Sequence, residues 1–122
     1  MRLNVTPVGT RLWVRSYAPG RLRIGDQEIT APVILSAQAL RTDFRPAHPE
    51  ALEEQDLAAV FDLKPEVVLL GWGGGRPLLT AHQRSWFLQR AIGIEAMDLG
   101  AACRTYNVLL GDDRAVVALL FP

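Results

Sequence analysis

A glycine-rich segment in the middle of the chain, Gly71–Gly75 with a tryptophan at its second position, has the composition of a ligand-binding loop. It follows the apolar run Val67–Leu70 and precedes a segment with helical spacing, a setting in which backbone amides can hold phosphate. Arg76 and Pro77 follow, whereas a Walker A loop has lysine and a hydroxyl residue there, and a dinucleotide-binding loop has a small residue in place of Arg76. We therefore expect a tight turn that borders a crevice. The candidate binding residues in this turn are Gly71, Trp72 and Gly73.

Three further side chains that could take part in binding or catalysis lie close together in the sequence near the carboxyl end: Cys103, Arg104 and Asn107. If this segment is helical, Asn107 shares a surface with the other two, because residues three and four apart are neighbours on a helix. Arg104 and Asn107 are candidate binding residues for an anion or a protein partner, since a guanidinium presents a fork of donors to carboxylate or phosphate. An internal salt bridge from Arg104, for example to Asp98, explains that residue equally well.

Cys103 is the single cysteine and is the candidate reactive thiol. A place early in a helix favours the thiolate through the helix dipole. A nucleophile also needs a general base, and neither His48 nor His82 is tied to Cys103 by its spacing. Small apolar neighbours favour an inert, buried cysteine instead. We assign no catalytic residue, and one cysteine with two scattered histidines forms no metal-binding pattern and implies no cofactor.

The composition is that of a folded chain without an electrostatic preference. The 122 residues are 49% hydrophobic and 21% charged, which suits a single domain over residues 1–122. Thirteen basic and thirteen acidic residues give zero net charge, so no field attracts nucleic acid or an anionic membrane. The lone cysteine forms no internal disulfide, and neither a signal sequence nor a transmembrane run is present. These features predict a cytoplasmic protein; the oligomeric state is left open.

The elements that must position these side chains begin with strands. Residues 13–18 and 22–24 alternate between apolar and polar types, and Pro19 with Gly20 between them indicates a tight turn, so we expect a hairpin. A third short stretch, Gln27–Ile29, follows it.

The middle of the chain changes pattern twice. Val33–Leu35 lacks alternation, which predicts a strand covered on both faces. Residues 37–49 have no clean period and are expected to form a loop. Between Pro49 and Pro65 the apolar residues recur at helical spacing and predict one helix.

The second half predicts a parallel crossover. Val67–Leu70 is expected as a buried strand, Thr80 as the cap of a helix through about Ala91, and Ile94–Met97 as a second strand. Strand, helix and strand in this order imply a right-handed connection. Asp98 is expected to cap a third helix, and Ala115–Phe121 forms a last buried strand. The predicted fold class is α/β, with a parallel βαβ crossover and an amino-terminal β-hairpin layer.

The order of segments from Val67 onward is distinctive: an apolar strand into Gly71, Trp72 and Gly73, then residues 93–98, then residues 101–109, then a strand from Arg114 to Leu120. Together these segments resemble a family of uncharacterised proteins that includes mitochondrial respiratory complex I assembly factor 3 and the adipogenesis-associated domain protein of animals. The resemblance covers nearly the whole chain, and residues 101–109 are its most specific part.

The resemblance implies one three-layer α/β domain with a mixed central sheet, helices on one side and the hairpin strands on the other. It supplies no established catalytic residues. Trp72 stands where the family usually has a small hydroxyl residue, and Leu99 where it usually has threonine. Strand-like sequence begins within a dozen residues of Met1, which leaves no room for an organelle-targeting segment and favours a bacterial protein.

Two functions follow as hypotheses. The first is a non-enzymatic binding or assembly module with a protein partner, with Trp72, Arg104 and Asn107 on one exposed patch. The alternative is a small-molecule or anion-binding protein, or an enzyme, that uses the crevice at Gly71–Gly75 with Arg104 and Asn107.

Overall fold

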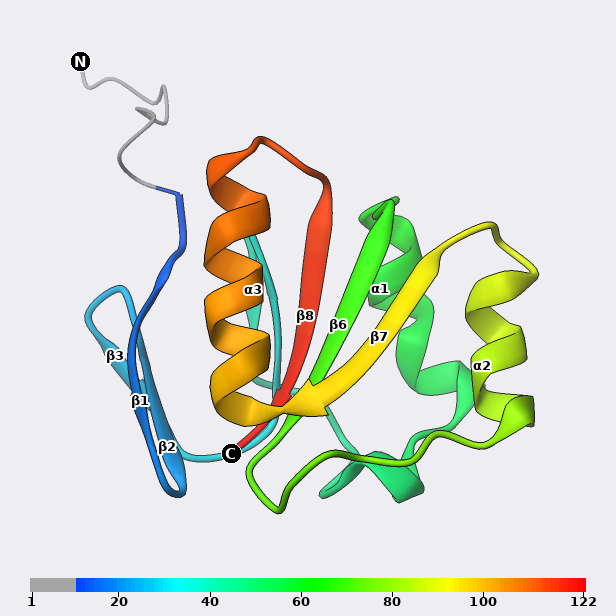
Figure 1. Ribbon diagram of the computed structural model, residues 1–122, viewed down its shortest axis with the longest axis horizontal. Helices are drawn as coiled ribbons and strands as arrows, with labels where there is room; N and C mark the ends of the chain where they lie inside the picture. The colour runs from blue at the N-terminus through cyan, green and yellow to red at the C-terminus, as the bar shows by residue number, and fades with distance from the viewer. Residues whose placement is uncertain (1–10) are drawn as a thin grey trace.

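The computed structural model describes residues 11–122, in which strands and helices are arranged in layers (Figure 1). The strands and the two longer helices lie close to the segments that the sequence pattern predicts. In chain order the elements are β1 (Val14–Ala18), β2 (Arg21–Ile24), β3 (Gln27–Ile29), β4 (Val33–Ser36), β5 (Leu40–Arg41), the 3-10 turns η2 (Pro49–Ala51) and η3 (Glu54–Leu57), α1 (Ala58–Asp62), β6 (Val67–Trp72), α2 (Ala81–Leu88), β7 (Gly93–Asp98), α3 (Leu99–Gly111) and β8 (Val116–Phe121).

The strands form two sheets. A three-stranded antiparallel sheet has the order β1-β2-β3, and a five-stranded sheet has the order β5-β4-β8-β6-β7. In the larger sheet β6 pairs in parallel with both β7 and β8, while β4 pairs antiparallel with β8 and β5. The predicted mixed central sheet and α/β fold class are therefore confirmed. Every residue of β4 and of β8 is buried, as expected of strands covered on both faces.

The placement of the helices corrects the expectation drawn from the family resemblance. α3 lies on the same face of the large sheet as the hairpin strands and shares one apolar core with them, whereas α1 and α2 cover the opposite face over a second core (Figure 1). The reason is the handedness of the crossovers. The chain passes from β6 outward to β7 and then back across β6 to β8, so two right-handed connections place α2 and α3 on opposite faces.

The helix predicted between Pro49 and Pro65 is instead three short pieces, η2, η3 and α1. Glu53 is extended, with φ −118° and ψ 158°, and its side chain forms a reciprocal capping box with Asp56 that starts a new turn there. The apolar side chains still reach the core, since Leu52, Leu57 and Val60 are buried. The apolar spacing of this segment therefore predicts which side chains are buried, but it does not predict a continuous helix.

α2 begins as predicted and ends early. Thr80 caps it, with Gln83 completing the capping box in both directions. Phe87 is buried, but Leu88 is 66% exposed and Ala91 lies in the left-handed region, with φ 57°. The helix therefore ends before the predicted Ala91, and its buried face stops at Phe87. The expected loop over residues 37–49 contains the short strand β5.

Candidate functional site

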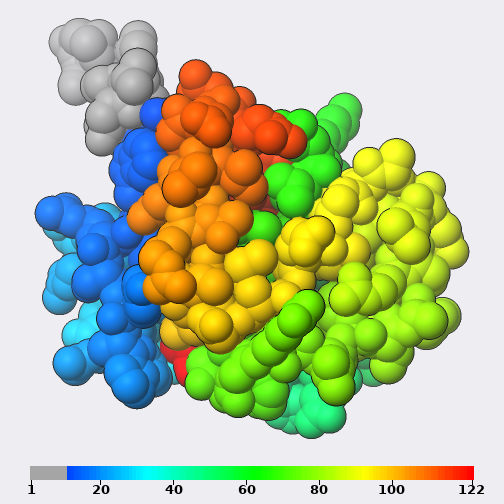
Figure 2. Space-filling model, in the orientation of Figure 1, coloured from blue at the N-terminus to red at the C-terminus, as the bar shows by residue number. Residues whose placement is uncertain are grey.

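A groove opens where β6 and β7 end, α3 begins and the β1–β2 turn approaches. Its volume is about 420 Å³. Figure 2 shows the three contributing segments meeting on one face, with the hairpin in blue, the start of α3 in yellow-orange and the loop after β6 in green. We call it the Trp72 groove. Its lining residues are Tyr17, Ala18 and Pro19 of the hairpin, Trp72, Gly73 and Gly75 of the loop, and Asp98, Leu99, Gly100 and Arg104 around the start of α3.

Two backbone amides of the glycine loop already form hydrogen bonds within the protein itself. The amide of Gly73 donates to the Phe121 carbonyl at 2.8 Å, and that of Gly75 donates to the Trp72 carbonyl at 3.2 Å. The indole of Trp72 packs against Gly74, where a Cβ would lie 2.5 Å from ring atom Cζ2. This contact explains the glycine at position 74. Because the amides of Gly73 and Gly75 already donate hydrogen bonds within the protein, they are not free to hold a phosphate. Trp72 and Gly73 line the groove as surface rather than as hydrogen-bond donors.

Gly71 does not line the groove. It is buried within β6, and a Cβ at this position would overlap the Cβ of Ala102 on α3. The glycine permits the helix and the strand to approach closely. Its contribution to the groove is indirect, because this close packing sets where the first turn of α3 lies.

Arg104 lies on the exposed side of α3 at the rim of the groove. Its Nη1 donates to the hydroxyl of Tyr17, and its guanidinium carbon lies 5.9 Å from the centre of the Tyr17 ring. The alternative salt bridge to Asp98 is absent: one oxygen of Asp98 accepts from the Ala101 amide at 2.8 Å as the cap of α3. Within residues 11–122, Arg104 has no carboxylate partner. A cation is therefore available at an otherwise largely apolar groove.

Asn107 is separated from this arrangement by its own hydrogen bonds. Its Oδ1 accepts from the Val14 amide at 3.0 Å, and its Nδ2 donates to the Val14 carbonyl at 2.9 Å. The side chain replaces a neighbouring strand for one residue of β1 and joins the hairpin to α3. Asn107 does not line the Trp72 groove, and we assign it a structural role.

Cys103 faces the core and not the groove. It is 1% exposed, and burial raises the pKa of its thiol from the ordinary value of 9.0 to about 12. The nearby charge of Arg104 lowers the pKa by a smaller amount. At neutral pH the group is a neutral thiol packed among apolar side chains, which is the state of an inert cysteine.

Tyr17 is a groove residue that was not among the candidates from the sequence, as are Asp98, Leu99 and Gly100 at the start of α3. Tyr17 is 41% exposed and contacts Gly100 and Arg104 of α3. Strand alternation placed it in the hairpin without indicating which helix end it would reach. Its single local signal was an aromatic residue two positions before the Pro19–Gly20 turn.

Within residues 11–122, no three residues of the His, Cys, Asp and Glu types are grouped so as to hold a metal ion. In the same part of the chain, none of the helices combines the length and the apolar character needed to cross a bilayer.

Comparison with known proteins places the chain in a family. The family described as a protein of unknown function (DUF498/DUF598) matches residues 14–121. The chain belongs to this family. A crystal structure of a protein from Bordetella parapertussis is similar over 95% of this chain and 99% of its own, with 29% identity and a TM-score of 0.86. The two agree over nearly the whole fold.

Two relatives carry descriptive names. One is the "13 kDa major membrane protein" of Francisella tularensis, 24% identical over 98% of each chain. The other is the bovine NADH dehydrogenase (ubiquinone) 1 alpha subcomplex assembly factor 3, 25% identical over 91% of this chain. This chain spans 61% of the length of the bovine protein. The resemblance to a family containing complex I assembly factor 3 is confirmed.

Proposed function

We propose that this chain is a non-enzymatic binding module that assists the assembly of a respiratory or other protein complex and holds a protein partner in the Trp72 groove. The observation that carries the proposal is the pairing of largely apolar walls with one cation, Arg104, that has no carboxylate partner within residues 11–122. Apolar surface beside aromatic and arginine side chains is the usual composition of a protein-binding hot spot. The bovine relative, named as an assembly factor, supports a protein partner.

The same geometry defines the partner's contact. A segment with an apolar side chain for the walls at Trp72 and Leu99, and a carboxylate for Arg104, matches the groove in shape and charge. Tyr17 holds the guanidinium at the rim, so less side-chain entropy is lost on binding. No reaction is required of any residue in this contact, and Cys103 takes no part in it.

The test is affinity capture of the tagged chain from its own cells, comparing wild type with Arg104→Glu. We expect the reversal to reduce a stoichiometric partner at least about tenfold, because it places a like charge against the partner's carboxylate. The matched control is Arg41→Glu on β5, at the opposite sheet edge from β7, where only an exposed ion pair to Asp43 is lost. Both variants should melt near the wild-type temperature. Equal capture by wild type and Arg104→Glu would refute this use of the groove.

A small ligand is the second candidate, favoured by the groove volume alone, which lies in the range of small-molecule sites. If wild type captures no protein, a ligand screen by thermal shift with the Arg104→Glu variant decides this alternative. Cytoplasmic localisation stays a prediction, and the name of the Francisella relative makes cell fractionation the companion measurement.

A further inference from the structure

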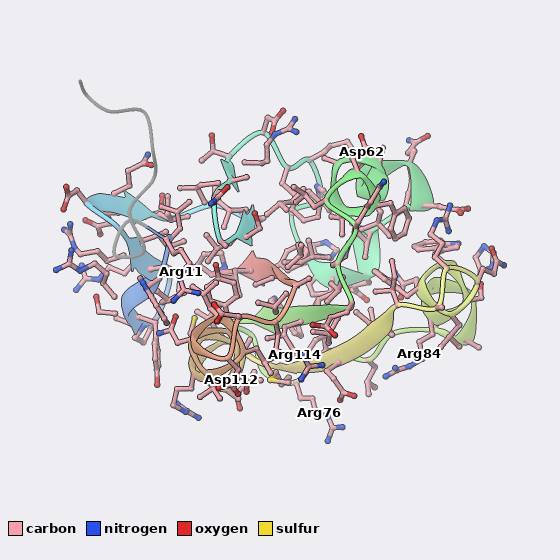
Figure 3. All side chains as sticks on the ribbon, turned by 90° about the horizontal axis from the view of Figure 1, so that it is seen from above. Arg11, Asp62, Arg76, Arg84, Asp112 and Arg114 are labelled. Carbon is pink, nitrogen blue, oxygen red and sulfur yellow. The ribbon has the colours of Figure 1, made fainter. Side chains whose placement is uncertain are left out.

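A seam of contacts joins α3 to the segment that enters and forms β1. Its contacts lie three residues apart on both sides: Arg11 with Leu110, Val14 with Asn107, and Tyr17 with Arg104. The two segments therefore run in opposite directions. Figure 3 shows Arg11 between the hairpin strands and the end of α3 that carries Asp112. The last contact, at Tyr17, is the one that borders the Trp72 groove.

The contacts at Val14 and at Tyr17 differ in what they bind. The side-chain amide of Asn107 accepts from the Val14 N–H at 3.0 Å and donates to the Val14 carbonyl at 2.9 Å. Because this amide has the donor and acceptor of a peptide unit, it takes the place of a neighbouring strand. Arg104 donates to the hydroxyl of Tyr17 and not to its backbone. The seam thus pairs the backbone of β1 at Val14 only.

The register of the hairpin gives the direction of the Tyr17 backbone. Ala18 and Arg21 flank a two-residue turn, and such a pair exchanges backbone hydrogen bonds. Tyr17 opposite Leu22 is the next pair, and since the two kinds of pair alternate, the N–H and C=O of Tyr17 point away from β2. β1 is an outer strand of its sheet, so this is the side on which Asn107 meets Val14. Within residues 11–122, no backbone group of another element bonds Tyr17.

We propose that the partner of the Trp72 groove binds as an extended segment that adds a short strand to β1 at Tyr17 and sets an acidic side chain on Arg104; this inference rests on the function proposed above. In strand addition, backbone hydrogen bonds supply affinity and side-chain contacts supply specificity. Arg104 has no carboxylate partner within the described residues, so it selects the acidic side chain. A helix has already paired its own backbone groups and cannot pair with Tyr17.

The probe is a library of short random peptides displayed on phage and selected on the wild-type chain. Selected peptides are synthesised, and their affinities for wild type, Arg104→Glu and Arg23→Glu are measured by fluorescence anisotropy. We expect the peptides to share an acidic residue and to bind Arg104→Glu at least about tenfold more weakly. Arg23→Glu is the matched control, because Arg23 is exposed on the hairpin and lies between the buried Leu22 and Ile24 in β2. This control should bind within about twofold of wild type.

Hydrogen exchange at single amides separates strand addition from binding through side chains alone. The Tyr17 amide should exchange at least about tenfold more slowly when the peptide is bound. The Val14 amide is the internal control, because Asn107 already accepts its hydrogen bond, and its exchange should not change. Methylation of the peptide nitrogens, one at a time, should identify one N–H that is required for binding at a position where alanine is tolerated.

The outcomes distinguish this inference from the proposed function. Binding that needs Arg104 but leaves exchange at Tyr17 unchanged overturns strand addition and leaves the groove as a protein-binding site, as does a peptide that binds as a helix. Peptides that bind Arg104→Glu as tightly as wild type, or a library that yields no binder, overturn both. Circular dichroism and melting of each variant establish that a loss is in binding and not in folding.

Discussion

Cys103 and Asn107 lie one turn apart on α3 and have opposite surroundings. Cys103 is buried among apolar side chains. Asn107 forms hydrogen bonds to the backbone of Val14 with both its amide oxygen and its amide nitrogen. Their spacing suggested a shared functional surface, but each is fixed by a different neighbour of the helix. Only Arg104, between them, faces the groove.

The buried thiol makes stability sensitive to alkaline pH. Burial raises the pKa of Cys103 to about 12 in the folded chain, against 9.0 when it is exposed. Between these values the unfolded chain loses the proton and the folded chain keeps it, so stability is fully present below about pH 9 and is lost as pH rises. We expect the free energy of unfolding to fall by roughly 1 to 2 kcal/mol between about pH 8 and about pH 10.5 from this group.

Urea unfolding of wild type and Cys103→Ala at the two pH values measures the effect. The variant should be less stable at both, because the sulfur packing is lost, and should show a smaller decrease with pH. Burial also raises the pKa of Tyr106, which acts in the same direction in both proteins. An identical decrease in the two chains would contradict the assignment to Cys103.

The role of a residue was predictable where it depends on residues nearby in the sequence, and it was not predictable where it depends on residues far away in the sequence. Thr80 and Asp98 cap their helices as expected, because a cap acts on amides within the next turn. Tyr17 and Asn107 bind partners 87 and 93 positions away in the chain. Nothing in their own neighbourhood reveals that the hairpin docks along α3.

Helix α3 and strand β6 meet at their smallest residues. A Cβ on Gly71 would overlap that of Ala102 and lie 3.4 Å from the Cα of Leu99. Since Leu99 and Gly100 begin the helix and line the Trp72 groove, this contact also sets the position of the groove wall.

We expect Gly71→Ala to destabilise the chain by about 1 to 3 kcal/mol through overpacking. Ala102→Gly should cost about 1 kcal/mol through helix propensity. The double variant should lose less than the sum of the two, because removing one methyl makes room for the other. Urea unfolding of all four chains supplies the cycle, and strict additivity would show that the two positions do not compete for space.

Element types were predicted where the apolar residues formed either a helical stripe or an unbroken run. These two patterns correctly identified β6, α2, β7, α3 and β8. The helical stripe failed over residues 49–65, where the same apolar spacing is compatible with 3-10 turns, and the patterns missed β5, whose two residues are too few to show alternation.

At the scale of the whole fold, residues 11–122 contain two apolar cores separated by the large sheet. One lies between the sheet and the layer of α3 with the hairpin, and the other lies under α1 and α2. The family resemblance implied three layers with the helices on one side and the hairpin on the other, and the placement of α3 is the part that is wrong. The side that each helix takes depends on the strand order across the sheet. Once the order β8-β6-β7 is known, handedness fixes the answer.

This arrangement predicts a gradient of local stability. β8 pairs on both sides and is buried throughout, whereas within residues 11–122 the outer strands β1 and β3 of the small sheet each pair with one strand. Native-state hydrogen exchange should be at least about tenfold slower in β8 and β6 than in β1 to β3. Slow exchange of equal extent in all of these strands would mean that the hairpin layer opens only with global unfolding.

The position of β8 has a consequence for synthesis of the protein. It is the central strand of the large sheet, yet the other four strands of that sheet all precede it in the chain. On the ribosome, the β4–β5 pair and the β6–β7 pair therefore emerge as two halves without a common partner. Apolar side chains such as Leu35 and Leu70, fully buried in the finished fold, stay uncovered until the last strand is translated. During that interval the nascent chain is a substrate for chaperones, and a ribosome stalled before β8 releases a chain prone to aggregate.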